Sequence, residues 1–368
     1  MIYLDYNATA PLRDAAFATM SEALRQGGNP SSVHRQGRSA RRRIEEAREI
    51  VAAAVGAAPN GVIFTSGGTE ANNLALSAFP GRRILASAVE HPSILKGKID
   101  AVVPVDRYGL IDLAALDEML SADKTPALLA LMLANNETGV VQPVAEAAAL
   151  AHRYGALVHG DAIQAFGKLP VDLAALGLDS LSLSAHKIGG PQGVGALVLA
   201  DPEADIASLI VGGGQERRHR AGTENVAGIA GFAAAVADLG DIAAESARLA
   251  VLRDRIETAA LESLPGVTIF GRKVGRLPNT SCLALPKIPA QTLLMALDLA
   301  GIAVSAGSAC SSGKLAPSPV LLAMGETALA GSAIRLSVGW ATTPEEIESF
   351  LDQFVSISQR LMREHQAA

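Results

Sequence analysis

The feature that most constrains the fold of this chain is an alternation of short, continuously apolar segments with alanine-rich helical segments. Strands are predicted at 61–65, 83–86, 127–134, 156–159, 180–183 and 195–199. Helical patterns lie between them, for example from Thr69 to Ala78 and from Pro143 to Tyr154. Because continuous apolar strands joined by helices are typical of a mostly parallel sheet covered on both faces, we predict an α/β large domain.

The pattern changes toward the carboxyl end of the chain. A long helical stretch runs from Thr223 to about Leu264. Shorter strand candidates then follow, at 267–270, 281–285 and 334–338. The change predicts a second, smaller α+β domain. We place the large domain at residues 13–250 and the small domain at residues 251–368 together with residues 1–12.

The overall composition fits a soluble globular enzyme. The chain has 368 residues, of which 49% are hydrophobic, so it is long enough to bury more than one core. A formal charge of -6 argues against general affinity for nucleic acid or for anionic membranes. The segment 1–6 has neither the basic start nor the apolar core of a signal peptide, and the apolar segment 127–134 is too short to span a bilayer. We therefore expect a cytoplasmic location.

Few residues are available for metal or disulfide chemistry. Cys282 and Cys310 are the two cysteines, so a disulfide framework is excluded and one bridge is formally available. His152 and His159 are the nearest pair of histidines, but they lie on either side of a predicted helix-to-strand turn. We therefore expect no intrinsic metal site. Cys282 lies among strand residues, where burial is its expected role.

Lys187 follows the predicted strand at 180–183 and is the first candidate catalytic residue. An apolar setting favours the neutral amine of a lysine, which then becomes a nucleophile toward carbonyl groups. Ser184 and His186 precede it and carry groups that hydrogen-bond phosphate. We interpret this segment as the covalent anchor of pyridoxal phosphate (PLP); a surface lysine in a strand-to-loop turn is the alternative.

A glycine turn joins the strand at 61–65 to the helical pattern that begins near Thr69. Such a turn directs backbone amides and the positive end of the helix dipole at an anion. Gly68 and Thr69 are therefore candidate phosphate ligands, although an ordinary capped helix start has the same pattern. The turn lacks the lysine of a Walker loop, and its glycine spacing differs from that of a dinucleotide fingerprint.

Two residues after other predicted strands are suited to a planar cofactor. Asp161 ends an apolar strand at the sheet edge where ligands of α/β proteins collect, and its carboxylate can keep a pyridine nitrogen protonated. A cap on the following helix is the alternative role of this aspartate. His91 also follows a strand, and its imidazole can stack on a ring and transfer protons, or simply pack as a structural residue.

Three further residues are candidates for contact with a substrate. Asn136 follows the strand that ends at Ala134, where its amide suits a carboxylate or a phenolic oxygen, unless the segment is only a turn. Arg335 lies between apolar strand residues and requires an oxyanion, which is either a substrate carboxylate or an internal Asp or Glu. Cys310 lies in a run of small residues from Ser305 to Gly313, so it is either a nucleophile delivered by a loop or an ordinary exposed thiol.

The order of these motifs resembles that of the cysteine desulfurases (NifS/IscS-like) of the class V aminotransferase family, which are PLP-dependent enzymes of fold type I. The resemblance covers nearly the whole chain. The segments that carry it are 5–11, 28–34, 65–70, 90–91, 135–139, 161–164, 184–187, 212–216, 222–225 and the loop around Cys310. It implies a PLP cofactor held in a large α/β domain, with a smaller carboxyl-terminal domain that carries the catalytic cysteine loop.

The resemblance also implies a role for individual residues. Lys187 would bind PLP covalently, Asp161 would pair with the ring nitrogen, and Gln164 would hydrogen-bond the phenolic oxygen. His91 would stack on the ring and take part in proton transfer. The implied phosphate ligands are Gly68, Thr69, Ser184, His186 and Thr223 of the partner subunit. Arg335 and Asn136 would hold the substrate carboxylate, and Asn136 would also lie against the cofactor.

The implied reaction converts L-cysteine to L-alanine and leaves the sulfur on Cys310 as a persulfide. The implied partners are L-cysteine, a second copy of the chain in a homodimer, and an iron-sulfur scaffold or another sulfur-acceptor protein. Any iron-sulfur cluster that Cys310 ligates would be transient and shared with a partner. Three alternatives stay open: a selenocysteine lyase, another class V lyase or aminotransferase, and a sulfur-relay protein that docks partners but has little turnover of its own.

Overall fold

The computed structural model describes residues 1–307 and 316–367. Its largest sheet has seven strands in the order β2–β8–β7–β6–β5–β3–β4, which are Val62–Thr65, Gly195–Leu199, Ser180–Ser184, Leu157–Asp161, Ala127–Met132, Arg83–Ser87 and Ala101–Val103. Strands β7, β6, β5, β3 and β4 are parallel, whereas β8 is antiparallel to both of its neighbours. The predicted mostly parallel sheet is confirmed, and all six predicted strands belong to it.

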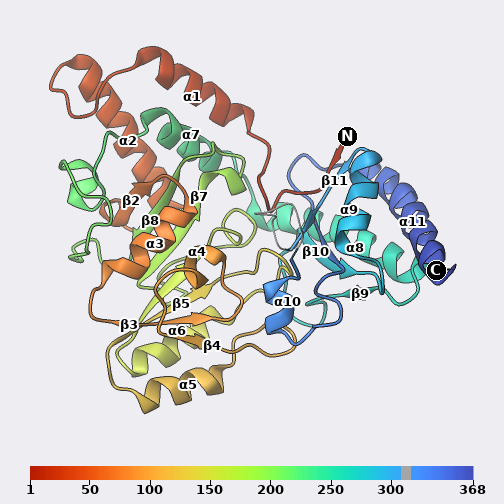
Figure 1. Ribbon diagram of the computed structural model, residues 1–368. Helices are drawn as coiled ribbons and strands as arrows, with labels where there is room; N and C mark the ends of the chain where they lie inside the picture. Colours follow the sequence, from red (N-terminus) through yellow and green to blue (C-terminus); the bar gives the residue numbers. More distant parts are fainter. Residues whose placement is uncertain (308–315, 368) are drawn as a thin grey trace.

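Helices cover both faces of this sheet (Figure 1). They are α1 Asp14–Gln26, α2 Arg35–Ala53, α3 Gly68–Ala78, α4 Pro92–Leu95, α5 Leu113–Ala122, α6 Val144–Arg153 and α7 Val226–Ala237. Alternate residues of a strand point to opposite faces. In β2, Val62 and Phe64 pack in the core that includes α2 and α7, whereas Ile63 packs against α3. Burial on both faces explains why the strand sequences are continuously apolar.

A second unit is built on a four-stranded antiparallel sheet. Its strands, in the order β12–β13–β10–β9, are Ser305–Ala306, Ala333–Ser337, Thr280–Ala284 and Thr268–Ile269. Beside it, β1 (Ile2–Tyr3) pairs in parallel with β11 (Ile302–Ala303). The helices of this unit are α8 Ile242–Ser263, α9 Ala290–Leu299, α10 Pro319–Ala323 and α11 Pro344–Ala367.

Each unit has a large apolar core of its own, and a smaller cluster joins Val89 and Met132 of the first unit to Cys282 and Val320 of the second. The core of the second unit contains Leu4 together with apolar residues between Leu249 and Leu361. The largest core of the seven-stranded sheet draws its residues from the chain between Ala16 and Leu277. This separation is in keeping with an α+β unit beside an α/β unit, while the exact domain boundaries at residues 13 and 250 stay a prediction.

The predicted helical stretch from Thr223 to Leu264 is two helices rather than one. Helix α7 ends at Ala237, Gly240 has a φ of +66°, and the Asp241 side chain accepts hydrogen bonds from the first amides of α8. An aspartate cap after a left-handed glycine starts a new helix in a new direction. Within residues 1–307 and 316–367 no single helix is long and apolar enough to cross a membrane; α7 and α8 reach that length and composition only as a pair bent by 80°.

Candidate active site

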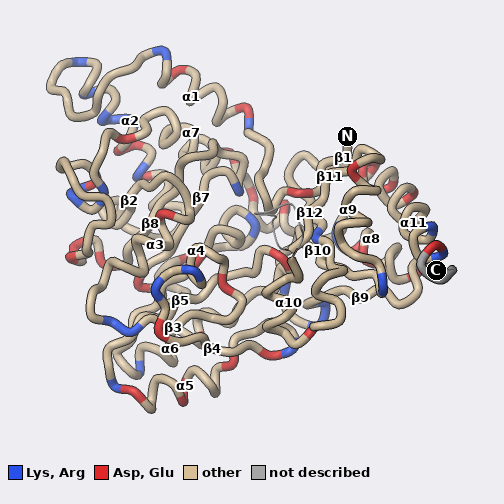
Figure 2. The backbone as a smooth tube through the Cα atoms, in the orientation of Figure 1, with Lys and Arg blue, Asp and Glu red and all other residues tan. Residues whose placement is uncertain are grey.

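The predicted site residues collect at one edge of the seven-stranded sheet. Because β8 reverses direction between β2 and β7, strands β2, β3, β5, β6 and β7 all end at this edge. Parallel strands that end together place the residues after them around one crevice. The residues at or just after these ends are Gly68, Thr69, His91, Asn136, Asp161 and Ser184. Figure 2 shows that basic and acidic residues are interspersed along the chain.

Asp161 ends β6 and is only 4% exposed. Its Oδ1 accepts a hydrogen bond from the Ile163 amide at 3.0 Å, and its Oδ2 accepts one from Asn72 Nδ2 at 2.8 Å. Burial raises the pKa of this carboxyl, and the two hydrogen bonds oppose the increase. Both donors are neutral, so the carboxylate retains capacity for a cationic N–H group. A protonated pyridine nitrogen is such a group, and the residue therefore fits PLP.

Lys187 lies in a 3₁₀ turn, Ala185–Lys187, that follows β7 directly. Its Nζ donates to the backbone oxygens of Asn7 at 2.6 Å and Ala8 at 2.7 Å. Burial, and after it the charge of Arg335, lowers the pKa of this lysine to about 8. More of its amine is therefore neutral at physiological pH than in an ordinary lysine, as a nucleophile toward an aldehyde requires.

The candidate phosphate ligands also lie close together. A methyl group added at Gly68 would overlap the side chain of Ile163 and lie 3.4 Å from Ser184 Cβ, so the start of α3 packs against the ends of β6 and β7. The first amides of a helix have no partner within the helix. His186 Nδ1 lies 3.1 Å from Thr9 Oγ1, and burial lowers the pKa of His186 to about 4. These hydroxyl, amide and imidazole donors fit a phosphate group.

Arg335, on β13 of the second unit, reaches the same crevice. Its Nη2 donates to Asp5 Oδ1 at 2.6 Å and its Nη1 donates to the Asn136 backbone oxygen at 3.1 Å. The internal carboxylate that the sequence left open as an alternative is therefore Asp5. Arg335 Nε is buried and has no hydrogen-bond partner, so the guanidinium keeps one N–H available for a second anion.

Gln164 lies between two residues that sequence reasoning missed, Asn7 and Lys168. Gln164 Nε2 donates to the Asn7 backbone oxygen at 2.9 Å, and Gln164 Oε1 accepts from Lys168 Nζ at 2.8 Å. These two bonds fix the orientation of the amide and leave its second N–H for another acceptor. The phenolic oxygen of PLP is an acceptor of the required kind.

Lys168 is a buried cation whose hydrogen-bond partners are all neutral oxygens. Besides Gln164 Oε1, its Nζ donates to the Gln164 backbone oxygen at 3.1 Å and to Asn7 Oδ1 at 3.3 Å. Burial, and after it the charge of Lys187, holds the pKa of Lys168 well below the usual lysine range. Its only signal in the sequence is its place in the largely apolar segment 165–171.

Asn7 connects the first unit to the second and is 1% exposed. Its Nδ2 donates to Thr280 Oγ1 at 2.8 Å and to the Asn136 backbone oxygen at 3.2 Å, and its Oδ1 accepts from Asn279 Nδ2 at 3.1 Å. Asn7 belongs to the segment 5–11, one of those that carry the family resemblance, but its neighbours in the sequence do not indicate these hydrogen bonds. They require residues more than a hundred positions away.

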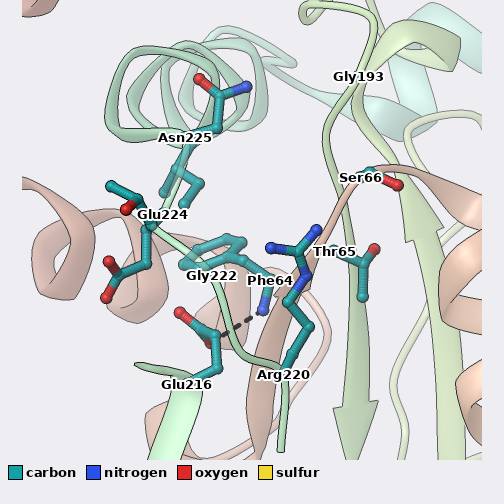
Figure 3. A pocket seen from close by; sticks show the side chains of 11 residues that line it. Phe64, Thr65, Ser66, Gly193, Glu216, Arg220, Gly222, Glu224 and Asn225 are labelled. Atoms are coloured by element: carbon teal, nitrogen blue, oxygen red, sulfur yellow. Dashed lines mark hydrogen bonds between the residues drawn. The ribbon is translucent and has the colours of Figure 1, made fainter. Parts of the chain in front are cut away.

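Thr223 is exposed and borders a cavity of about 170 Å³ beside the end of β2. Figure 3 shows this cavity with Arg220 between Thr65 and Glu216. Arg220 Nε donates to Glu70 Oε1 at 2.9 Å, while Glu216 accepts from the Phe64 amide at 3.0 Å. In this chain Thr223 is therefore placed near the glycine turn, and its contact with a cofactor in another subunit stays a prediction.

Cys310 lies outside the residues that the structure describes, because these end at Gly307 and begin again at residue 316. Gly307 and Ser318, which flank this segment, both lie against Glu137; a methyl group at Gly307 would overlap Glu137 Oε2, and Ser318 Oγ donates to the same oxygen. Cys282 is fully buried as predicted, and burial raises the pKa of its thiol. The described residues contain no group of three or more metal-ligating side chains.

Comparison with known proteins identifies the family. The model of the family Aminotransferase class-V matches residues 2–350. The cysteine desulfurase of Cereibacter sphaeroides is 44% identical, covering 98% of this chain and 96% of that protein. The cysteine desulfurase IscS of Dictyoglomus turgidum is 41% identical, covering 98% of this chain and 95% of that protein.

Solved structures agree with this assignment. The X-ray structure of a NifS-like protein from Rickettsia africae superposes with a TM-score of 0.91 at 38% sequence identity, covering 98% of this chain and 99% of that chain. Since the matches to the family and to its desulfurase members span nearly the full length, the resemblance inferred from the motifs is confirmed. The chain belongs to the cysteine desulfurases of the class-V aminotransferase family.

Proposed function

We propose that this protein is a PLP-dependent cysteine desulfurase that converts L-cysteine to L-alanine and takes the sulfur onto Cys310 as a persulfide. The observation that carries the proposal is the meeting of Lys187, Asp161 and Arg335 in one crevice. A nucleophilic amine, a buried carboxylate and a guanidinium are what binding of PLP and an amino acid requires. The near full-length similarity to desulfurases selects cysteine among amino acids.

Several residues would hold the cofactor. PLP, when bound, supplies a conjugated ring that stabilises negative charge at the α carbon of an amino acid. Lys187 would bind it covalently, while Asp161 would keep the ring nitrogen protonated. Gln164 would donate to its phenolic oxygen, and His91 would stack on the ring and contribute to proton transfer. The phosphate would be bound by Gly68, Thr69, Ser184, His186 and Thr223 of the partner subunit.

Substrate binding and sulfur transfer would use different parts of the chain. Arg335, through its unpartnered Nε, and Asn136 would hold the substrate carboxylate and so fix the position of the cysteine side chain. The Cys310 thiolate would then attack the substrate sulfur. A sulfur–sulfur bond forms, the carbon–sulfur bond breaks, and its electron pair leaves with the carbon fragment, which gains a proton and is released as alanine. No external oxidant is needed.

The persulfide would next pass to an iron-sulfur scaffold or to another sulfur-acceptor protein. We propose that the enzyme works in the cytoplasm as a homodimer, with Thr223 completing the site of the other subunit. A loop thiol suits this sequence of events because the same sulfur has to meet first the substrate and then an acceptor.

The direct test is release of alanine from L-cysteine by the PLP-loaded protein. Cys310→Ser should lower the rate by at least about a hundredfold, because a hydroxyl does not accept sulfur under these conditions. Cys282→Ala removes the other, buried thiol and should leave the rate within about twofold of wild type. Lys187→Ala should abolish the visible absorbance of covalently bound PLP.

Two outcomes would contradict the proposal. Wild-type alanine release by Cys310→Ser would make the loop thiol dispensable, and the same variant active with selenocysteine would identify a selenocysteine lyase. Negligible turnover of cysteine by a protein that carries PLP would instead favour a sulfur-relay protein.

A further inference from the structure

A continuous chain of hydrogen bonds connects His91 to Asp161 through two residues that have no assigned role, Ser93 and Asn72. Asn72 Nδ2 lies 2.9 Å from Ser93 Oγ and 2.8 Å from Asp161 Oδ2. Ser93 Oγ lies 2.8 Å from His91 Nδ1. Asn72 is fully buried and Ser93 is 9% exposed, so water does not replace these partners readily. The two residues therefore join His91 to the carboxylate expected at the ring nitrogen.

The geometry fixes which nitrogen of His91 carries the proton. His91 is the N-cap of α4, and the Ser93 backbone amide lies 3.1 Å from His91 Nδ1 and donates to it. A backbone amide is always a donor, so Nδ1 must present its lone pair. The proton of a neutral His91 is then on Nε2.

The direction of every other bond in the chain agrees with this assignment. An asparagine side-chain nitrogen has two hydrogens, and Asn72 donates one to Ser93 Oγ and one to Asp161 Oδ2. Ser93 Oγ, having accepted a hydrogen bond, donates its own hydrogen to His91 Nδ1. Asn72 Oδ1 faces His159 Nε2 at 3.2 Å, and His159 Nδ1 lies 2.9 Å from Ser180 Oγ.

His159 holds the orientation of Asn72 from the other side. It is fully buried, and burial lowers its pKa to about 3, so it stays neutral. Because the Asn72 nitrogen has to face the Asp161 carboxylate, Asn72 Oδ1 faces His159 Nε2, which donates to it and also lies 3.3 Å from Ser182 Oγ. If the Asn72 amide were flipped, its nitrogen would face the His159 donor and its oxygen would face the Asp161 carboxylate. Both contacts would be repulsive, so one orientation of the amide is selected.

We propose that Asn72 and Ser93 are positioning residues that hold His91 in the tautomer with its proton on Nε2 and link it to the carboxylate of Asp161. His91 then presents an N–H donor on its side away from Ser93. Protonation at Nδ1 would break the bond from the Ser93 backbone amide and reverse the bond from the Ser93 hydroxyl. His91 would therefore act through its Nε2–H, as a donor of a hydrogen bond or of a proton, and would be a poor base. Removal of the substrate's α proton is then left to the neutral amine of Lys187. The assignment of α-proton removal to Lys187 rests on the proposed function.

The tautomer can be measured by NMR of the full-length protein labelled with ¹⁵N-histidine, with and without PLP. The chain has seven histidines, and the His91 signals are those lost in His91→Gln. At neutral pH we expect an unprotonated Nδ1 and a protonated Nε2. In Ser93→Ala the hydroxyl donor is lost, so the Nδ1 signal should move toward the protonated position, and Ser93→Thr should restore it.

Turnover provides the second readout. Ser93→Ala should lower kcat for cysteine about five- to tenfold and change KM less than about twofold, since the substrate carboxylate is held elsewhere. Ser77→Ala is the matched control, because the Ser77 hydroxyl bonds only to backbone oxygens of its own helix, α3. Its His91 signals and kcat should equal those of wild type.

A protonated Nδ1 in the wild-type protein would overturn the inference, as would His91 signals or a kcat that Ser93→Ala leaves unchanged. The wild-type spectrum is decisive by itself if a variant does not fold. The tautomer is also independent of catalysis: a protein that did not turn over cysteine would contradict the proposed function while leaving the tautomer to be decided by NMR.

Discussion

Lys187 and Lys168 place two ammonium groups in buried positions near one another. Each donates only to neutral oxygens, from Asn7, Ala8 and Gln164. Burial penalises the charged form, and a nearby positive charge adds to that penalty, from Arg335 for Lys187 and from Lys187 for Lys168. Both lysines therefore have lowered pKa values. For Lys187 this predicts a pH-dependent rate of covalent PLP binding, and for Lys168 it predicts a pH-dependent stability.

The nucleophilicity of Lys187 should depend on pH in a range where an ordinary lysine does not react. The rate at which PLP-free protein binds PLP covalently is expected to increase from pH 7 to pH 9, with a midpoint at about 8. The cause is the growing fraction of neutral amine. Stopped-flow absorbance measures the rate, with Lys187→Ala as the control that gives no covalent product. A midpoint near the ordinary lysine value of about 10.4 would contradict the assigned environment.

Lys168 should make the stability of the PLP-free protein depend on pH. Its folded pKa is lowered, so above that value the unfolded chain binds more protons than the folded chain, and stability increases with pH until the unfolded lysine also loses its proton. The slope is at most about 1.4 kcal/mol per pH unit for one group. Urea unfolding of Lys168→Met at several alkaline pH values should show a smaller slope than wild type.

Lys98→Met, at an exposed position, is the control for Lys168 and should keep the wild-type slope. Equal slopes in wild type and Lys168→Met would show that Lys168 is not the group responsible.

The position of a candidate residue in the crevice was predictable where the residue follows a strand. Asp161, His91 and Lys187 could be selected because a polar side chain after an apolar strand of a parallel sheet has a defined place in space. Asn7, Lys168, Asn72 and Ser93 could not be selected by this rule. Each of them has at least one partner that is distant in the sequence, as in the bond from Asn72 to Asp161 and the bond from Lys168 to Asn7, and only the folded chain brings these partners together.

At the scale of elements, β8 brings the glycine turn to the lysine. Gly195, its first residue, is paired with Thr65 at the end of β2 and with Ser184 at the end of β7. A methyl group at Gly195 would lie 2.7 Å from the Gly67 carbonyl carbon and 2.5 Å from the Leu183 oxygen. Only a residue without a side chain allows this approach of backbone to backbone.

Gly195→Ala should therefore displace the turn that precedes α3. Overpacking of this kind is expected to lower the free energy of unfolding by about 1–3 kcal/mol. PLP affinity should decrease as well, by about tenfold, because the amides of the turn lose their alignment with the phosphate. Denaturant unfolding and PLP titration measure the two effects.

The matched control is Gly214→Ala, at an exposed glycine where an added methyl group meets no atom within 4 Å. It should leave both quantities unchanged. An unaltered PLP affinity in Gly195→Ala would show that the turn is not a phosphate site.

The direction of β8 illustrates what sequence patterns omit. A continuous apolar segment predicts a strand that is buried on both faces. It does not specify whether that strand pairs with its neighbours in parallel or antiparallel fashion. The segment 195–199 was correctly predicted as a strand of the sheet, whereas its reversal followed only from the contacts with β2 and β7. Likewise, the break between α7 and α8 depends on Gly240 and Asp241, whose turn chemistry is hidden inside a long helical pattern.

At the scale of the whole molecule, the crevice draws residues from both units. Arg335 comes from the four-stranded sheet, Lys187 follows the seven-stranded sheet, and Asn7 lies between them. The same crevice is proposed to include Thr223 of the partner subunit. That proposal makes each site dependent on two chains.

Mixed dimers test this dependence. Lys187→Ala removes the lysine of its own site, and if the proposal is correct Thr223→Val impairs only the site of the other subunit. In a mixed dimer one site then has both defects and the other has neither. Random exchange makes half of the dimers mixed, so the mixture should recover about a quarter of wild-type activity. No recovery, with subunit exchange demonstrated by mass spectrometry, would place Thr223 in the site of its own chain.

Among the residues that the structure describes, the candidate site residues of the seven-stranded sheet lie at the edge where its parallel strands end, away from the opposite edge. On that edge, turns at Gly81 and Gly155 lead into β3 and β6, and an added methyl group at either glycine meets no atom within 4 Å. These turns are therefore natural insertion points for a fluorescent reporter or an affinity tag. Such a protein could be immobilised or imaged from the edge of the sheet opposite the crevice, so that the inserted tag would not obstruct the crevice that contains Lys187 and Asp161.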